Sequence, residues 1–474
     1  MKIFNTLSRQ KEEFIPINPP EVKMFVCGMT VYDQPHIGHA RTYIVFDMVA
    51  KYLRKRGFDV SYLQNVTDID DKIIQRAKEA DVNFKEISEK YENQYLASMS
   101  ALGIDSVWKY VRATDNIKEI IAQIQRLIDS GYAYAVPANS QVNPEFQDVY
   151  FDISKFSRYG QLSGQNLAEM ETGVRKDLEA NKRDPRDFAL WKALNIKSEP
   201  SWKSPWGLGR PGWHIEDTAI SEKYFGQQYD LHGGGLDLIF PHHEAEIAQQ
   251  EASSGKSPFV RYWMHSGWLT VDGVKMSKSL KNFISIDDML VKYTPEAIRM
   301  MALSTHYRSP VNYTEKLMPQ NQAAVNRIYS FVQRLKNVSG DENTELDKIA
   351  EATLNKFTLA MDDDFNTSLA LGALFEMIKS VNIIIDQGTI SKKQGKKIIK
   401  LLQEFNEVLG IVPQKEYEIP ENISILVQKR EMARESKNWE ESDNIRNEIE
   451  SLGYKVEDTE YGPLVLTNSL IFDK

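Results

Sequence analysis

The stretch Val22–Tyr62, which reads VKMFVCGMTVYDQPHIGHARTYIVFDMVAKYLRKRGFDVSY, decides the fold. Its first residues, Val22–Val26, form an apolar run that is typical of a buried strand and is followed by turn-forming residues. A helix is predicted over His39–Arg56, with Gly57 as its cap, because apolar residues recur there every three or four positions. The next segment, Phe58–Tyr62, alternates as a strand. The unit is therefore β–α–β, which indicates a parallel sheet.

A parallel sheet of this kind collects functional residues at the carboxyl ends of its strands. The segments that follow the two predicted strands are Cys27–His39 and Asn65–Asp71, and we expect both to line the active site. The expected fold class is therefore α/β with a Rossmann-type core.

The bulk composition is that of an ordinary globular protein, with 42% hydrophobic, 10% aromatic and 26% charged residues. A chain of 474 residues is too long for one hydrophobic core, and roughly three or four structural units are expected. The formal charge of −9 says nothing about RNA, because 58 Lys and Arg residues can form a basic groove within an acidic protein.

The chain has a single cysteine, Cys27, and no apolar run of about eighteen residues. An internal disulfide and an all-thiolate metal site are therefore excluded, and any metal must rely on histidine and carboxylate ligands. The N-terminus lacks the apolar stretch of a signal peptide, so we expect a cytoplasmic protein with no membrane partner.

The pattern changes several times beyond the first β–α–β unit. The alternation breaks from about residue 115 to residue 200, which indicates an inserted segment. Three glycines then precede a predicted strand, Leu236–Phe240, and a helix opened by Pro241. After Asn312 only helical periodicity is visible, and a linker is predicted at Val412–Pro420.

Two short motifs far apart in the chain suit one chemical task. His36–His39 (HIGH) lies at the start of the predicted helix, where backbone N–H groups and the helix dipole favour phosphate. Lys275–Ser279 (KMSKS) contains two lysines in a short loop. Such donors would stabilise the charge on the α-phosphate and pyrophosphate when an acid is activated with ATP. Taken singly, each motif is more simply explained as a chance match or a solvated turn.

With these motifs the chain resembles class I aminoacyl-tRNA synthetases, and the similarity narrows to the cysteinyl-tRNA synthetase family. The similarity covers nearly the whole chain. Besides the two motifs, it is carried by Cys27–Asp33, Asn65–Lys72, Gly209–Glu216, His232–Gly235, Phe240–Glu244, Met361–Thr367 and Arg434–Arg446. The resemblance implies a Rossmann-type parallel-sheet catalytic domain with an inserted connective domain, followed by an all-α C-terminal region with a small terminal anticodon-binding domain.

The resemblance also implies a division into six segments. Residues 1–115 and 201–265 would form the two halves of the catalytic domain, with residues 116–200 as the inserted connective domain. Residues 266–315 would carry the KMSKS loop and a stem-contact region, residues 316–412 a helical bundle, and residues 413–474 the small tRNA-binding domain.

In the family that the chain resembles, a zinc ion binds the thiolate of the substrate, and its protein ligands map onto Cys27, Asp217, His242 and Glu246. Three of them have some independent warrant. His242 and Glu246 are four residues apart on one predicted helix and share a face, and Cys27 ends the first strand. Without the resemblance, a hydrogen-bonded helix pair and a buried small hydrophobe would be the simpler explanations.

Position 217 departs from the commonest family pattern, in which it is a cysteine. An aspartate oxygen can bind zinc at a similar distance, but it is a harder ligand than thiolate. Two outcomes are open: zinc is held by all four residues, or Asp217 stays outside a weaker three-ligand site. In both cases fewer protein thiolates leave the metal more electrophilic, which favours capture of an incoming thiolate.

The expected roles follow from the motifs and the resemblance. The residues expected to stabilise phosphate charge during catalysis are His36, His39, Lys275 and Lys278. ATP binding is expected at these residues together with Gly38 and Ser277. The candidates for contact with the substrate are Thr67, Trp213 and Asp237, with Asp68 facing the same pocket; Trp213 could equally be a core residue. The expected cofactors are one zinc ion per chain and magnesium with ATP, and the expected partners of a monomer are L-cysteine, ATP and tRNA(Cys).

Two other functions share parts of this pattern. A cysteine ligase of the mycothiol pathway resembles the same catalytic core but uses an amino sugar, and residues 423–474 argue against it because a small acceptor needs no tRNA-reading domain. A catalytically silent tRNA-binding paralogue would have no chemical reason to keep both motifs intact. The stretch Arg434–Arg446, with Trp439, suits phosphate contact and base stacking, although a solvated charged helix explains it as well.

Overall fold

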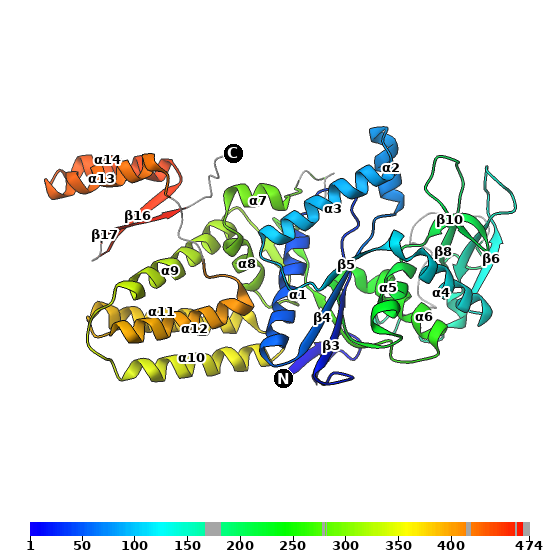
Figure 1. Cartoon of the computed structure of the whole chain (residues 1–474), viewed down its shortest axis with the longest axis horizontal. Helices are drawn as coiled ribbons and strands as arrows, with labels where there is room; N and C mark the ends of the chain where they lie inside the picture. The colour runs from blue at the N-terminus through cyan, green and yellow to red at the C-terminus, as the bar shows by residue number, and fades with distance from the viewer. Residues whose placement is uncertain (166–181, 277–279, 281, 414–418, 460–461, 468–474) are drawn as a thin grey trace. The chain divides into compact units, whose positions relative to one another are not determined.

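The computed structural model describes residues 1–165, 182–276, 280, 282–413, 419–459 and 462–467 (Figure 1). The chain divides into two compact units. Unit 1 consists of residues 1–35, 53–97 and 105–268, and unit 2 of residues 36–52, 98–104 and 269–474. The helices α1 (Ile37–Lys55) and α3 (Phe84–Ala101) each continue from one unit into the other.

The centre of unit 1 is a five-stranded sheet in the order β12-β11-β3-β4-β5, in which every neighbouring pair is parallel. Its strands are β3 (Glu21–Val26), β4 (Asp59–Val66), β5 (Lys109–Arg112), β11 (Tyr229–Gly235) and β12 (Val260–Ser266). Most residues of β4 and β11 are buried, as expected for parallel strands that are covered on both faces. The expected Rossmann-type α/β core is confirmed.

A second sheet, antiparallel throughout and ordered β6-β7-β8-β10-β9, lies within the segment expected to be inserted and extends a little beyond it. Its strands are β6 (Ala133–Pro137), β7 (Gln147–Phe151), β8 (Phe188–Ala193), β9 (Trp202–Ser204) and β10 (Gly207–Pro211). The N-terminus adds a hairpin of β1 (Lys2–Asn5) and β2 (Gln10–Glu13). The other helices of unit 1 are α2 (Asp71–Ala80), α4 (Ile117–Asp129), α5 (Ile215–Phe225) and α6 (Glu244–Ser254). One buried apolar core, with Phe25, Trp191 and Trp263 among its members, joins both sheets to α4, α5 and α6.

The predicted strand Leu236–Phe240 is wrong. The glycines themselves end the strand β11, and a 3-10 turn and a π-helical turn, Ile239–His243, lead into α6. The physical reason is a close approach: a Cβ on Gly234 would lie 2.8 Å from the ring of His243. Gly234 therefore belongs to the strand itself, where it leaves room for the ring of His243, and it does not mark a loop before a further strand.

Unit 2 is mainly helical. Its small sheet consists of β13 (Leu269–Val271), β14 (Val274–Lys275) and β15 (Val311–Tyr313). The helices are α7 (Ile286–Lys292), α8 (Pro295–Leu303), α9 (Leu317–Asn337), α10 (Glu345–Asp362), α11 (Thr367–Asp386), α12 (Lys392–Leu409), α13 (Glu421–Glu435) and α14 (Trp439–Ser451). Helices α9 to α12 contact one another as a bundle (Figure 1).

The C-terminal region contains one element that helical periodicity after Asn312 does not predict. The strands β16 (Tyr454–Thr459) and β17 (Gly462–Thr467) pair as an antiparallel hairpin. Its buried residues Tyr454, Val456 and Val465 pack with α13 and α14 in a separate small core. Among the helices that the structure describes, α11 alone is long and apolar enough to cross a membrane, and half of its apolar window is buried.

Candidate metal centre and nucleotide-binding residues

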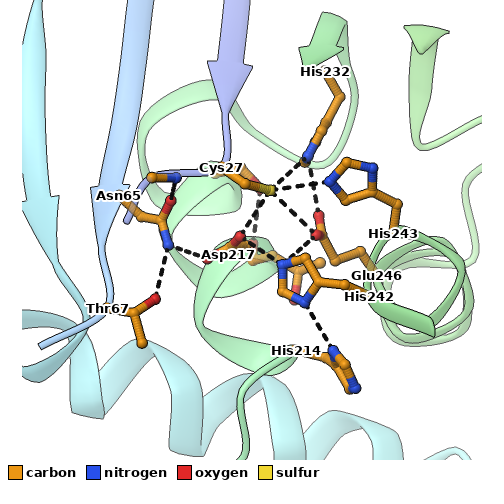
Figure 2. Close-up of polar contacts among 12 residues, drawn as sticks. Cys27, Asn65, Thr67, His214, Asp217, His232, His242, His243 and Glu246 are labelled. Carbon is orange, nitrogen blue, oxygen red and sulfur yellow. Dashed lines mark hydrogen bonds and ion pairs between the residues drawn. The ribbon is translucent and has the colours of Figure 1, made fainter. Parts of the chain in front are cut away.

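Cys27 directly follows β3, at the point where the strand order of the central sheet reverses between β3 and β11. Its side chain is buried and surrounded by polar groups (Figure 2). The thiol donates to Asp217 Oδ2 at 3.2 Å, and Sγ lies 3.1 Å from His243 Nε2, 3.3 Å from His232 Nε2 and 3.8 Å from Glu246 Oε1. Side chains that are distant in sequence therefore converge on one sulfur atom.

His242 closes the other side of this group. Its Nε2 atom lies 3.0 Å from both Asp217 Oδ2 and Glu246 Oε1, the latter contact reflecting the four-residue spacing along a helical stretch. Its Nδ1 atom lies 2.8 Å from Nδ1 of His214. The ring also stacks on Trp213, with 4.2 Å between centroids and 19° between planes. The expected ligand His242 is thus held by contacts on several sides.

The buried donors form two overlapping groups that could each hold a metal ion. The first group is Cys27, Asp217, His242 and Glu246, and the second is Cys27, His232, His243 and Glu246. Within each group the ligand atoms lie within 4.8 Å of one another. The structure therefore brings together the four side chains expected from the resemblance and adds two histidines that had been given no role.

The crowding of buried acidic groups in the cluster fits a divalent cation. Burial, followed by the charges of Glu246 and Asp217, raises the pKa of the Cys27 thiol well above its usual range. Burial and Asp217 likewise raise the pKa of Glu246, whose Oε2 atom is buried without a hydrogen-bond partner. A metal ion would compensate these acidic groups, and sulfur, imidazole nitrogen and carboxylate oxygen are the donors that zinc takes.

Outer contacts fix the rings of the two additional histidines. The Nδ1 atom of His243 lies 2.8 Å from Nε2 of His265, whose own Nδ1 lies 2.8 Å from Oγ1 of Thr6. The Nδ1 atom of His232 lies 2.5 Å from the hydroxyl of Tyr229. Both rings therefore turn Nε2 toward Cys27, as metal-ligating histidines do when the second nitrogen is engaged. The strings His232–Gly235 and Phe240–Glu244 carried this signal in the sequence.

The substrate candidates differ in their surroundings. Trp213 stacks on His242, and Thr67 is buried and accepts from Asn65 Nδ2 at 3.3 Å. Asp68 instead accepts from the backbone N and the hydroxyl of Thr114, at 3.0 and 2.5 Å. Asp237 is exposed in the 3-10 turn after β11. Trp213 and Thr67 are therefore the two candidates that the described contacts connect to the cluster.

In unit 2, His36 caps the start of α1. Its Nδ1 atom accepts from the backbone N of Gly38 at 3.1 Å and of His39 at 3.3 Å, and its own backbone N donates to Nδ1 of His39. The two rings stack with 3.7 Å between centroids. Since both Nδ1 atoms accept, each neutral ring carries its proton on Nε2, and burial and His36 keep the pKa of His39 well below its usual range.

Glycine is required at position 38 because a Cβ there would lie 2.9 Å from the ring of His36. The segment after Lys275 returns to this turn. The backbone N of Ile37 donates to the Ile284 carbonyl at 3.1 Å, and Phe283 packs edge-on against His36. Lys275 ends β14, whereas Ser277 and Lys278 lie outside the described residues.

The C-terminal stretch proposed for RNA contact carries one exposed aromatic, Trp439, at the start of α14. The guanidinium of Arg434 lies 5.9 Å from its ring centroid and 3.2 Å from a carboxylate oxygen of Asp458. Arg446 pairs with Glu450 at 3.7 Å. Carboxylates thus partly balance the cations, while the tryptophan offers a stacking face.

Known protein families match most of the chain. The family described as tRNA synthetases class I (C) catalytic domain matches residues 13–323, and the DALR domain matches residues 356–413. The cysteinyl-tRNA ligase anticodon binding domain matches residues 417–462. The catalytic match and the parallel sheet define a class I aminoacyl-tRNA synthetase.

Full-length relatives narrow this class further. A cysteine–tRNA ligase of Caldicellulosiruptor saccharolyticus is 46% identical, covering 98% of this chain and 99% of the relative. The ligase of Thermodesulfovibrio yellowstonii is 43% identical, covering 97% of this chain and 98% of the relative. That of Clostridioides difficile is also 43% identical, covering 98% of this chain and 99% of the relative. The chain belongs to the cysteine–tRNA ligase family, and it is an ATP-dependent aminoacyl-tRNA ligase. The matches lend no support to the amino-sugar ligase or the silent paralogue.

Solved structures agree on the fold. Two structures of Mycobacterium tuberculosis methionyl-tRNA synthetase with methionyl-adenylate have TM-scores of 0.59 and 0.60. They share 16% and 17% identity with this chain, and the matches cover 77% and 82% of it and 84% and 90% of the other chains. At this identity they show a shared class I architecture.

Proposed function

We propose that this protein activates L-cysteine with ATP and esterifies tRNA(Cys), and that one zinc ion selects the thiol of the substrate. The proposed ligands of that ion are Cys27, Asp217, His242 and Glu246. The observation that carries the proposal is the meeting of these four buried donors within 4.8 Å in a chain of this family.

A zinc ion at this cluster would bind the substrate sulfur as a thiolate, which the hydroxyl of serine cannot imitate because it does not ionise readily. Trp213, through its stack on His242, would wall the pocket beside the ion. Thr67 and Asp237 are the other proposed contacts with cysteine, Asp237 serving its ammonium group. Selection by sulfur makes a separate editing domain unnecessary.

Adenylate formation requires the cysteine carboxylate to attack the α-phosphate of ATP while pyrophosphate leaves. We assign phosphate stabilisation to the Nε2–H groups of His36 and His39 and to the ammonium groups of Lys275 and Lys278, with magnesium on the phosphates. The capping contacts of His36 support this role, because they fix both rings with Nε2 as the donor. Gly38 and Ser277 complete the proposed ATP-binding set. Neither reaction step needs a covalent enzyme nucleophile, since positioning and charge stabilisation suffice.

The proposal includes a monomer in the cytoplasm. It also keeps the six segments 1–115, 116–200, 201–265, 266–315, 316–412 and 413–474 as functional divisions. The match of residues 417–462 to an anticodon binding domain supports tRNA recognition by the last of them. The adenosine hydroxyl at the 3′ end of the tRNA would attack the activated carbonyl and release AMP.

The test is metal removal from the full-length protein. Once the chelator has been removed and magnesium supplied, the zinc-free protein should show no cysteine-dependent exchange of pyrophosphate into ATP, and added zinc should restore the exchange, while ATP binding stays unchanged as the control. Asp217→Ala should weaken zinc binding more than about 100-fold, and Asp217→Cys should retain it. Normal cysteine activation by metal-free protein would overturn the zinc mechanism and leave only the adenylating scaffold.

A further inference from the structure

Asp217 has a buried side-chain hydrogen-bond donor beside it. The Nδ2 group of Asn65, near the end of β4, donates to Asp217 Oδ1 at 2.6 Å (Figure 2). The other carboxylate oxygen, Oδ2, faces Cys27 Sγ at 3.2 Å and His242 Nε2 at 3.0 Å. Both Asn65 and Asp217 are buried, with 2% and 1% of their surface exposed. The two carboxylate oxygens therefore have different partners: Oδ1 accepts from the asparagine, and Oδ2 faces the other proposed metal ligands.

The orientation of the Asn65 amide is determined by its other contacts. Its Oδ1 atom accepts from the backbone N of Gly28 at 2.5 Å, so the oxygen must face the segment after Cys27. The NH₂ group consequently faces Asp217, and it also reaches Oγ1 of Thr67 at 3.3 Å. With donor and acceptor both engaged, the amide is held in one orientation.

The chemistry of position 217 explains why such a contact matters. A cysteine offers one sulfur atom, whereas an aspartate offers two oxygens and can bind a metal through one or both. A hydrogen bond to Oδ1 favours binding through Oδ2 alone, which suits four-coordinate zinc. The donor is also neutral, so the carboxylate keeps the negative charge with which it attracts the cation.

We propose that Asn65 is a positioning residue that adapts the metal site to aspartate by holding Oδ1 and leaving Oδ2 as the single ligand atom. This inference rests on the proposed function, because it takes Asp217 as a ligand. It deepens that function by explaining how a carboxylate can stand where the family usually has a thiolate.

A double-mutant cycle on the full-length chain tests the proposal. Cobalt and zinc affinities would be measured by competition with a chromogenic chelator for the parent, Asn65→Ala, Asp217→Cys and the double variant. We expect Asn65→Ala to weaken metal binding about 10- to 100-fold in the chain that has Asp217. In the Asp217→Cys chain the same change should weaken metal binding less than about 3-fold. Asn65→Ala also removes the hydrogen bond from the backbone N of Gly28. That loss is the same with aspartate or cysteine at position 217, so it cancels when the two affinity losses are divided.

The visible spectrum of the cobalt-loaded protein gives a second readout. In Asn65→Ala the released Oδ1 can join the metal, so the coordination number rises and the absorption band weakens, whereas the Asp217→Cys background keeps its band. Asn65→Leu keeps a side chain of similar size and removes the NH₂ donor, so it should behave like Asn65→Ala and can replace it if that variant does not fold. Asn116→Ala, a change of another buried asparagine in unit 1, is the matched control and should leave affinity and spectrum unchanged.

The outcomes separate this inference from the proposed function. Equal losses of affinity in the two backgrounds would overturn the positioning role of Asn65, even if Asp217→Ala weakens the metal as expected. Unchanged affinity in Asp217→Ala would instead remove Asp217 from the ligand set, and this inference would fail together with that assignment.

Discussion

The cysteine-centred cluster of unit 1 and the histidine pair of unit 2 obtain their chemistry in opposite ways. The four proposed metal ligands are at most 5% exposed, and Cys27 lies 190 residues from Asp217 and 219 from Glu246 along the chain. His36 and His39 are half-buried neighbours on one turn, and the hydrogen bonds that cap the helix join their ring nitrogens to the backbone of that same turn. A buried cluster of side chains from distant segments depends on the whole fold, whereas a capped helix start depends mainly on local sequence.

This contrast predicts different responses to mutation. Each ligand of a buried cation supplies a large part of its binding free energy, so removal of one ligand side chain should lower the metal affinity strongly. Charge on a phosphate is shared among several donors, so single losses there should be graded.

The largest effect is expected for Cys27→Ser, which removes the one thiol of the cluster. Zinc affinity should fall by more than about 1,000-fold, because a neutral hydroxyl replaces a thiolate ligand. Cysteine-dependent pyrophosphate exchange should disappear with it. Zinc content and exchange rate would be measured on the same preparation, with ATP binding as the control. If Cys27→Ser kept its zinc, the metal would not depend on each ligand of the buried cluster, and the contrast with the histidine pair would be wrong.

Changes in the histidine pair should leave the metal in place. His39→Ala is expected to slow cysteine-dependent exchange about 100- to 1,000-fold, the range for loss of one preorganised donor, and Lys275→Ala about 10- to 100-fold. Zinc content should equal that of the parent in both variants. Lys292→Ala, which removes an exposed lysine of α7 in the same unit, serves as the control. Zinc loss in His39→Ala would contradict the independence of the two regions.

A smaller effect is expected where an aromatic side chain supports a ligand. Trp213→Ala removes the stack on His242 and should weaken zinc binding about 2- to 10-fold, which corresponds to the 0.5–1.5 kcal/mol typical of stacked rings. Trp213→Phe should recover most of the loss. Competition with a chelator would measure both. If phenylalanine and alanine behave alike, the stack does not hold His242.

The smallest effect concerns the acid stability of unit 1. Burial opposes ionisation of Asp71, but its ion pairs with Lys192 and Arg210, both at 2.7 Å, prevail and lower its pKa to about 2. The stabilisation is therefore complete above the unfolded pKa of about 3.9 and is lost as the pH falls through about 2. Asp71→Asn should lower stability at pH 7 by at most about 1 kcal/mol, because Asp71 is 49% exposed and solvent screens the pair.

Thermal unfolding of the parent and Asp71→Asn would be compared at pH 7 and near pH 2. The difference in melting temperature should shrink toward zero at the lower pH. A difference that grows with acidity would show that the carboxylate opposes folding. In a chain with Lys192→Met and Arg210→Met, the same change should have almost no effect at pH 7.

Local sequence predicted the parts of the molecule that local forces determine. The strand before Cys27, the helix after His36 and the spacing of His242 and Glu246 all appear in the structure. The structure corrects the strand expected at Leu236–Phe240: the glycines before it end the strand β11, and Gly234 leaves room for the ring of His243.

The residues of the candidate site that the sequence did not predict are brought together by tertiary contacts. His232 and His243 face the sulfur from a strand and a turn whose proximity only the folded sheet creates. Asn65 lies 152 residues from its partner Asp217, and periodicity gives no sign of such a pair. The departure at position 217 was visible in the sequence, but the residue that accommodates it was not.

Translation of these 474 residues requires cysteinyl-tRNA at one position, because Cys27 is their only cysteine. A second thiolate at position 217 would double that requirement. With aspartate there, these residues contain a single position that requires charged tRNA(Cys). Synthesis of these residues therefore draws on cysteinyl-tRNA at one position instead of two.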